Sequence, residues 1–244
     1  MTELNQMPAC SKPLLCDVFS FGISTKKDTL TLRKSTYKIL PKIKFKRKNE
    51  KKILLEKVDI ASYKINIPFT VGGGIKTEED VSILLQNGAD KISVNTAAFL
   101  DPSIIKRFAK NFGSQCVVLA IDAKCEADNN WYVYLKGGRE KTEMLVTQWA
   151  KMAVDLGVGE ILLTSMNHDG TKQGFALDIT ATLADSLPVP IIASGGGGTA
   201  AHFYDVFTKG KADAALAASI FHYKEIAIPD LKSYLHEKGI PIRL

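Results

Sequence analysis

The chain lacks several features that would commit it to particular classes of protein. Among its 244 residues no run approaches the roughly 20 apolar residues of a membrane-spanning helix, and no apolar core of the signal-peptide type opens it. Its four cysteines form no Cys-x-x-Cys pair and show no ligand spacing with histidine, which argues against zinc. We therefore expect a cytoplasmic protein with free thiols, no metal and no membrane partner.

Glycine and acidic residues are scarce in the first quarter of the chain. Of the 18 glycines only Gly22 precedes residue 66, and residues 1–65 hold 15 Lys and Arg against 6 Asp and Glu. Residues 66–244 hold 17 against 20, so the net charge of +6 comes wholly from the first quarter. The basic run 42–52 has one aromatic residue, Phe45, and we interpret it as a solvated face or a mobile segment rather than a nucleic-acid site.

From residue 66 onward, apolar runs and amphipathic segments alternate, which indicates a parallel sheet with crossover helices. A helix is also predicted over 47–65, and 14–19 and 37–40 resemble short strands. A hairpin arm is expected at 131–135, with its turn at Gly137-Gly138. The predicted strands are 67–71, 91–95, 117–121, 160–164, 189–193 and 214–217. The predicted helices are 77–87, 101–112, 147–156, 180–186, 200–208 and 228–238.

The second half of the chain repeats the first. Residues 67–74 correspond to 189–196, and residues 88–97 to 211–220, an offset of 122 to 123 residues in a chain of 244. A Rossmann sheet does not repeat in this way. We therefore predict an α/β fold, a (β/α)8 TIM barrel built from two half-barrels and forming one domain over 1–244, with 1–65 atypical.

The repeated glycine loops predict two phosphate sites. Glycines after a strand let backbone N–H groups approach an anion, and the next helix points its positive end at it. A single glycine run is more often a plain turn, but two copies half a chain apart predict a substrate with a phosphate at each end. The predicted phosphate-binding set is Gly73, Gly74, Asn95, Thr96, Thr164, Asp169, Gly170, Ser194, Gly195, Gly196, Ala218 and Ser219.

Asp122 follows an apolar, β-branched run that reads as a strand buried on both faces. A carboxylate at the carboxyl end of a barrel strand is the usual position of a catalytic group. The alternative is that Asp122 caps a turn or the next helix.

Several strings in 64–244 resemble the cyclase subunit of imidazole glycerol phosphate synthase. The related sugar isomerase of histidine biosynthesis shares the half-barrel plan but not this set of strings. The matching strings are 66–75, 88–98, 112–118, Ala120-Ile121-Asp122-Ala123-Lys124, 159–165, Asp169-Gly170-Thr171-Lys172 and Ile192-Ala193-Ser194-Gly195-Gly196.

This resemblance implies an ammonia-dependent lyase of histidine biosynthesis that needs no cofactor. It would convert a bis-phosphorylated ribulosyl intermediate into imidazole glycerol phosphate and aminoimidazole carboxamide ribotide. It also implies a heterodimer with a glutaminase that sends ammonia through the barrel, and two catalytic aspartates. Asp122 matches one of them, and Lys91 and Glu160 match charges at the ammonia entrance, although a structural ion pair would also explain those two residues.

The family's first-strand motif is not recognisable in 1–65. Asp17, in Leu15-Cys16-Asp17-Val18, is the only candidate there for the second catalytic acid. We therefore expect a disrupted first β/α module, with poorly ordered or non-native pairing and low activity. Two alternatives stay open: a barrel that only binds phosphate ligands or the glutaminase, and a related sugar-phosphate isomerase.

Overall fold

The computed structural model describes residues 17–20, 38–40, 58 and 67–242. The strands are β1 (Asp17–Ser20), β2 (Lys38–Leu40), β3 (Phe69–Gly72), β4 (Lys91–Val94), β5 (Val117–Cys125), β6 (Trp131–Leu135), β7 (Glu140–Leu145), β8 (Glu160–Ser165), β9 (Ile191–Ser194) and β10 (Ala214–Ala217). The helices are α2 (Glu78–Gln86), α3 (Thr96–Leu100), α4 (Ser103–Phe112), α5 (Val146–Asp155), α6 (Leu177–Ser186), α7 (Ala200–Thr208), α8 (Ser219–His222) and α9 (Ile228–Glu237), with a 3-10 turn at Ser114–Cys116.

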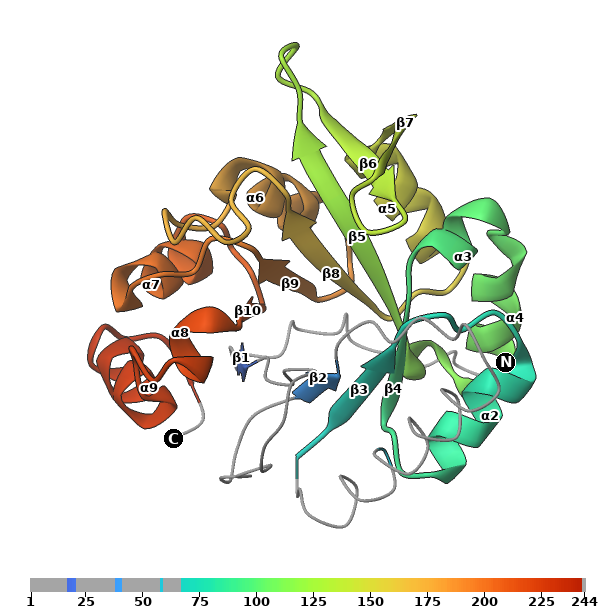
Figure 1. The fold of residues 1–244 in the computed structure, drawn as a ribbon, viewed down its shortest axis with the longest axis horizontal. Coiled ribbons are helices and arrows are strands. Elements are labelled where there is room, and N and C mark those ends of the chain that lie inside the picture. Colours follow the sequence, from blue (N-terminus) through green and yellow to red (C-terminus); the bar gives the residue numbers. More distant parts are fainter. Residues whose placement is uncertain (1–16, 21–37, 41–57, 59–66, 243–244) are drawn as a thin grey trace, which may run out of the picture.

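Eight of these strands pair in parallel in the order β1-β10-β9-β8-β5-β4-β3-β2. The two ends of this path, β1 and β2, lie beside each other. The helices cover the outside of the strands, as Figure 1 shows for α2, α4 and α5. This is the (β/α)8 barrel expected from the sequence. In the described part of the chain, all helices are too short or too polar to cross a membrane.

The first quarter of the chain contributes two strands to this barrel. β1 pairs in parallel with β10, and β2 with β3. The expected non-native pairing is therefore not found for these two strands. The helix predicted over 47–65 has one described residue, Val58, which is helical and buried, and the rest of that prediction lies outside the described residues.

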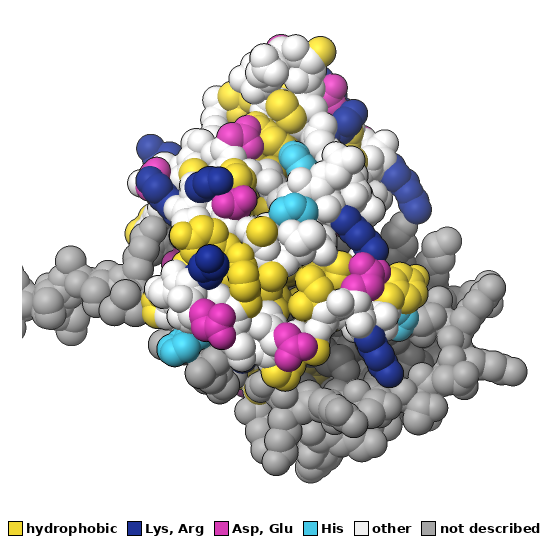
Figure 2. Space-filling view, turned by 90° about the vertical axis from the view of Figure 1, so that its left-hand side faces the viewer, with side chains coloured by type: hydrophobic (Ala, Val, Ile, Leu, Met, Phe, Trp, Pro, Cys, Tyr) yellow, Lys and Arg dark blue, Asp and Glu magenta, His cyan; other side chains and the backbone are white. Residues whose placement is uncertain are grey.

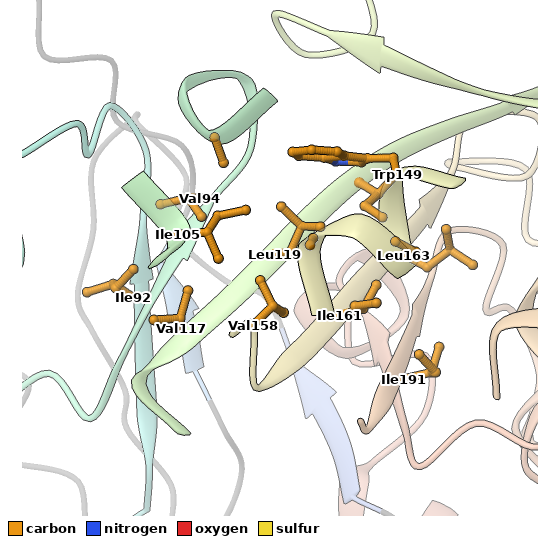
Figure 3. Close-up of a cluster of buried hydrophobic side chains, with 14 of the residues drawn as sticks. Ile92, Val94, Ile105, Val117, Leu119, Trp149, Val158, Ile161, Leu163 and Ile191 are labelled. Carbon is orange, nitrogen blue, oxygen red and sulfur yellow. The ribbon is translucent and has the colours of Figure 1, made fainter. Parts of the chain in front are cut away.

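The apolar core lies mainly between the strands and the helices. Figure 3 shows the outward-facing side chains of β4, β5, β8 and β9 meeting Ile105 of α4 and Trp149 of α5. The alternate positions on the same strands face the barrel interior, because successive side chains of a strand point to opposite faces. A smaller cluster fills this interior, formed by Val118, Leu162, Ile192, Ala214 and Leu216, with Ala120 packed against it.

The two half-barrels are built by equivalent contacts. The Asp90 carboxylate accepts a hydrogen bond from Phe69 N at 2.7 Å, and the Asp213 carboxylate accepts one from Ile191 N at 2.9 Å. Thr77 and Thr199, 122 residues apart, each form the capping box of the helix after a glycine loop. These matched contacts confirm the repeat at the level of hydrogen bonding.

Candidate functional site at the carboxyl end of the barrel

Asp122 lies at the carboxyl end of the barrel interior. It shares a face of β5 with Val118 and Ala120, and its register partner on β8 is Thr164, which is itself paired with Ser194 on β9. The side chains of the interior thus change from apolar to polar at this level. Asp122 is only 8% exposed, and its Oδ2 accepts a hydrogen bond from Asn95 Nδ2 at 3.1 Å.

The strand that carries Asp122 continues further than the sequence indicated. β5 was expected to end at Ile121 but runs to Cys125, because residues 122–125 pair antiparallel with 131–134 of β6. β6, β7 and the turn between them form the expected hairpin, which extends beyond the barrel (Figure 1). Asp122 is paired with Tyr134 of β6 and with Thr164 of β8, so it lies within a strand and does not cap the next helix.

The first glycine loop follows β3 and leads to α2. Gly73 and Gly74 have φ values of 113° and 74°, which residues other than glycine rarely adopt. Asn95 follows the neighbouring strand β4 and comes directly before α3. The next residue, Thr96, accepts a hydrogen bond at its Oγ1 from Lys136 N at 2.9 Å. The structure therefore brings Asn95 to Asp122, and Thr96 to the end of the β6–β7 hairpin.

The second glycine loop forms one wall of a hollow of about 170 Å³. Among the sequence-predicted residues, Thr164 does not line this hollow, although it lies next to Asp122 and Ser194 in the sheet. Lys172, Gly197, Leu216 and Ala217 also line it and were not predicted as site residues. The predicted residues that do line it are Asp169, Gly170, Ser194, Gly195, Gly196, Ala218 and Ser219.

Glycine is required in this loop by close packing as well as by conformation. Gly196 has a φ of 100°, and an added Cβ would lie 1.9 Å from the carbonyl oxygen of Gly174. Gly174 N donates a hydrogen bond to Gly196 O at 2.8 Å. The loop after β8 is thereby joined to the glycine loop.

The loop after β8 is also held to β5. Asn167 Oδ1 accepts from Cys125 N at 2.8 Å, and Asn167 Nδ2 donates to Cys125 O at 3.1 Å. Ser165 Oγ lies 2.8 Å from His168 Nδ1. These bonds connect the hollow to the strand that carries Asp122, so the two parts of the site are held in one frame.

Lys91 and Glu160 occupy the opposite, amino end of the barrel. They are the first residues of β4 and β8, and the Lys91 ammonium forms an ion pair with Glu160 Oε1. Along their strands they share faces with Asn95 and Thr164, so this pair lies at the other end of the same interior.

Asp17 is the first residue of β1 and is in register with Ala214, the first residue of β10. On β10 the hollow is lined by Leu216 and Ala217, which follow Ala214 toward the carboxyl end. The backbone of Asp17, which is level with Ala214, therefore lies nearer the amino end of the barrel than the site does. Its side chain is outside the described residues. Among the residues that the structure describes, no group of His, Cys, Asp and Glu is suited to hold a metal ion.

Comparison with known proteins agrees with the (β/α)8 fold. A family model described as "Histidine biosynthesis protein" matches residues 46–227. The chain is 55% identical over 194 residues to "Imidazole glycerol phosphate synthase subunit HisF" of Bacillus subtilis, covering 79% of this chain and 77% of the relative. It is 57% identical over 180 residues to the protein of that name from Phocaeicola vulgatus, covering 74% and 71%. The chain therefore belongs to the histidine biosynthesis protein family, in its branch of imidazole glycerol phosphate synthase HisF subunits.

Proposed function

We propose that this chain is the ammonia-dependent cyclase of imidazole glycerol phosphate synthase. The substrate would be a ribulosyl aminoimidazole carboxamide with a phosphate at each end, and the products imidazole glycerol phosphate and aminoimidazole carboxamide ribotide. The observation that carries the proposal is the position of Asp122, a buried carboxylate at the barrel mouth between two glycine loops related by the half-barrel repeat. Such an arrangement suits a substrate anchored at both ends with its reacting atoms in the middle.

In this proposal the glycine loops bind the two phosphates. Asp122, which lies between the loops, accepts and donates protons at the reacting part of the substrate. The hollow beside Gly196 would take one phosphate, and Gly73, Gly74 and Thr96 the other. Asn95 orients the Asp122 carboxylate through its amide hydrogen bond, which suits a group that must repeatedly accept and donate a proton at a fixed place. Asp17 stays the sequence's candidate for the second acid.

The partner would be a glutaminase docked at the amino end of the barrel. The Lys91–Glu160 pair lies there, and the interior between it and Asp122 is lined by apolar side chains, among them the small Ala120 and Ala214. An apolar lining suits neutral ammonia and disfavours ammonium, because an unpaired charge is costly in such surroundings. A cytoplasmic location is part of the proposal, and the free thiols Cys116 and Cys125 are consistent with a reducing compartment.

The test supplies the bis-phosphorylated intermediate and ammonium to the purified chain and follows both products by liquid chromatography. Formation of both products in equal amounts, without a glutaminase, is the expected result. Binding of the intermediate without turnover would support a barrel that only binds ligand. Conversion of an aminoaldose precursor into its ketose isomer would support the isomerase.

A further inference from the structure

The hollow at the second glycine loop contains a charged side chain that is already engaged by another residue. We propose that Lys172 supplies the positive charge for a phosphate bound in this hollow, and that Glu225 is a built-in competitor that holds Lys172 until the phosphate replaces it. The identity of the ligand as a phosphate ester rests on the proposed function, whereas the competition rests on the geometry of the pair.

The ion pair joins two loops at the edge of the hollow. Lys172 Nζ lies 2.5 Å from Oε1 and 2.8 Å from Oε2 of Glu225, so one ammonium meets both oxygens of the carboxylate. Lys172 belongs to the loop after β8 and lines the hollow, whereas Glu225 lies between α8 and α9. The side chains are 42% and 38% exposed, so the pair can open into solvent without unpacking the core.

The backbones on both sides of the pair are fixed. A Cβ added at Gly198 would lie 2.4 Å from Lys172 O and 2.7 Å from Lys172 Cβ, so Lys172 packs directly on the glycine loop. Glu225 N donates to Ile220 O at 2.8 Å. Exchange of partners therefore requires only rotation of two long side chains and no movement of the loops.

The local charge balance makes this exchange matter for affinity. The charged side chains lining the hollow are Asp169 and Lys172, and Glu225 neutralises the second of these. On the face shown in Figure 2, acidic and basic side chains of the described residues are interspersed. A dianion that enters the hollow thus meets an ammonium already paired with a carboxylate, and the repulsion from that carboxylate lowers the affinity.

The experiment measures binding of the bis-phosphorylated substrate by calorimetry, without ammonia and at low ionic strength. Glu225→Gln should tighten binding about 2- to 5-fold, the range of an exposed ion pair, and Lys172→Gln should weaken it. In the Lys172→Gln background, Glu225→Gln should have no effect. High salt should shrink the gain from Glu225→Gln, and inorganic phosphate should show the same order of affinities.

The matched control is the Lys211–Asp185 pair, which has the same two-oxygen geometry, at 2.9 and 2.7 Å, and lies outside the hollow. Asp185→Asn should leave affinity unchanged. Weaker binding by Glu225→Gln, or an equal gain in the Lys172→Gln background, would overturn the proposal. Because the readout is binding, its failure is separate from a failure of turnover, which would contradict the proposed function alone.

Discussion

Asn95 donates a hydrogen bond to the carboxylate of Asp122, with 3.1 Å between Nδ2 and Oδ2. The contact joins the end of β4 to β5 and gives a nearly buried carboxylate a partner. In the second half of the chain the position equivalent to Asn95 is Ala218, 123 residues later. The half-barrel repeat is therefore broken at the residue that orients the candidate catalytic acid, so the two ends of the site are not chemically equivalent.

Removing this amide should slow catalysis without unfolding the barrel. A hydrogen bond to a charged group contributes about 1.5–3 kcal/mol, so we expect Asn95→Ala to lower kcat roughly 10- to 100-fold. The measurement is ammonia-dependent turnover under saturating substrate. Asn87→Ala, which removes an amide bonded to a helix carbonyl, is the control and should keep its kcat. An unchanged kcat in Asn95→Ala would show that Asp122 needs no such orientation.

A negative charge in the second phosphate site should weaken substrate binding. Gly196 is a poor position for this charge, because a Cβ added there would meet the Gly174 carbonyl and the loop would shift. Ser219→Asp instead adds the charge at a half-buried residue that lines the hollow. We expect a rise in Kd of at least about 10-fold with an unchanged melting temperature. Ser233→Asp on the exposed face of α9 is the control. Equal Kd values for the two variants would show that the phosphate does not bind in this hollow.

The Lys91–Glu160 pair should affect ammonia delivery more than the chemistry. Lys91→Met leaves Glu160 without this partner at the amino end of the barrel. We expect lower glutamine-dependent turnover in the complex with the glutaminase, and nearly unchanged turnover with saturating ammonium. Lys209→Met breaks an exposed pair with Asp205 on α7 and should change neither rate. Equal losses in both assays for Lys91→Met would make the pair a structural element only.

The tip of the β5–β6 connection should keep its hydrogen bonds in moderately acidic solution. The Asn130 side chain, followed by the Tyr132 hydroxyl, lowers the pKa of Asp128 from 3.8 to about 2. A depressed folded-state pKa gives a stabilisation that is complete above 3.8 and is lost as the pH falls through about 2. The Asp128 carboxyl carbon, followed by NMR, should titrate near 2. Asn130→Ala should move that midpoint upward, and a midpoint of 3.8 in the unmodified chain would contradict the prediction.

Local sequence patterns were sufficient for most of the barrel. Helix α7 has the predicted bounds, because Thr199 caps its start. Strand β10 also has the predicted bounds, because a run of apolar residues forms it. The extension of β5 to Cys125 was missed because it depends on pairing with β6. The short helices α3 and α8 were missed because one turn carries too little periodicity.

The candidate site was predictable where the half-barrel repeat marked it. The glycine loops fall into this class. Asp122 was identified instead as the residue that follows a buried strand, because position along a parallel strand determines which residues reach the mouth. Lys172 was present in a recognised string, Asp169-Gly170-Thr171-Lys172, but its role depends on Glu225, 53 residues away. Contacts of that range leave no local pattern in a single sequence.

In the proposed function, Asp122 transfers protons in the cyclase reaction rather than holding the barrel together. The most direct measurement compares ammonia-dependent turnover and substrate affinity for the unmodified chain and Asp122→Asn, which keeps the shape and the capacity for hydrogen bonding. We expect turnover by the unmodified chain, a fall in rate of about 10²–10⁴ in the variant, and a similar Kd for both. Equal rates in the two proteins, or no turnover by the unmodified chain with intact binding, would contradict it.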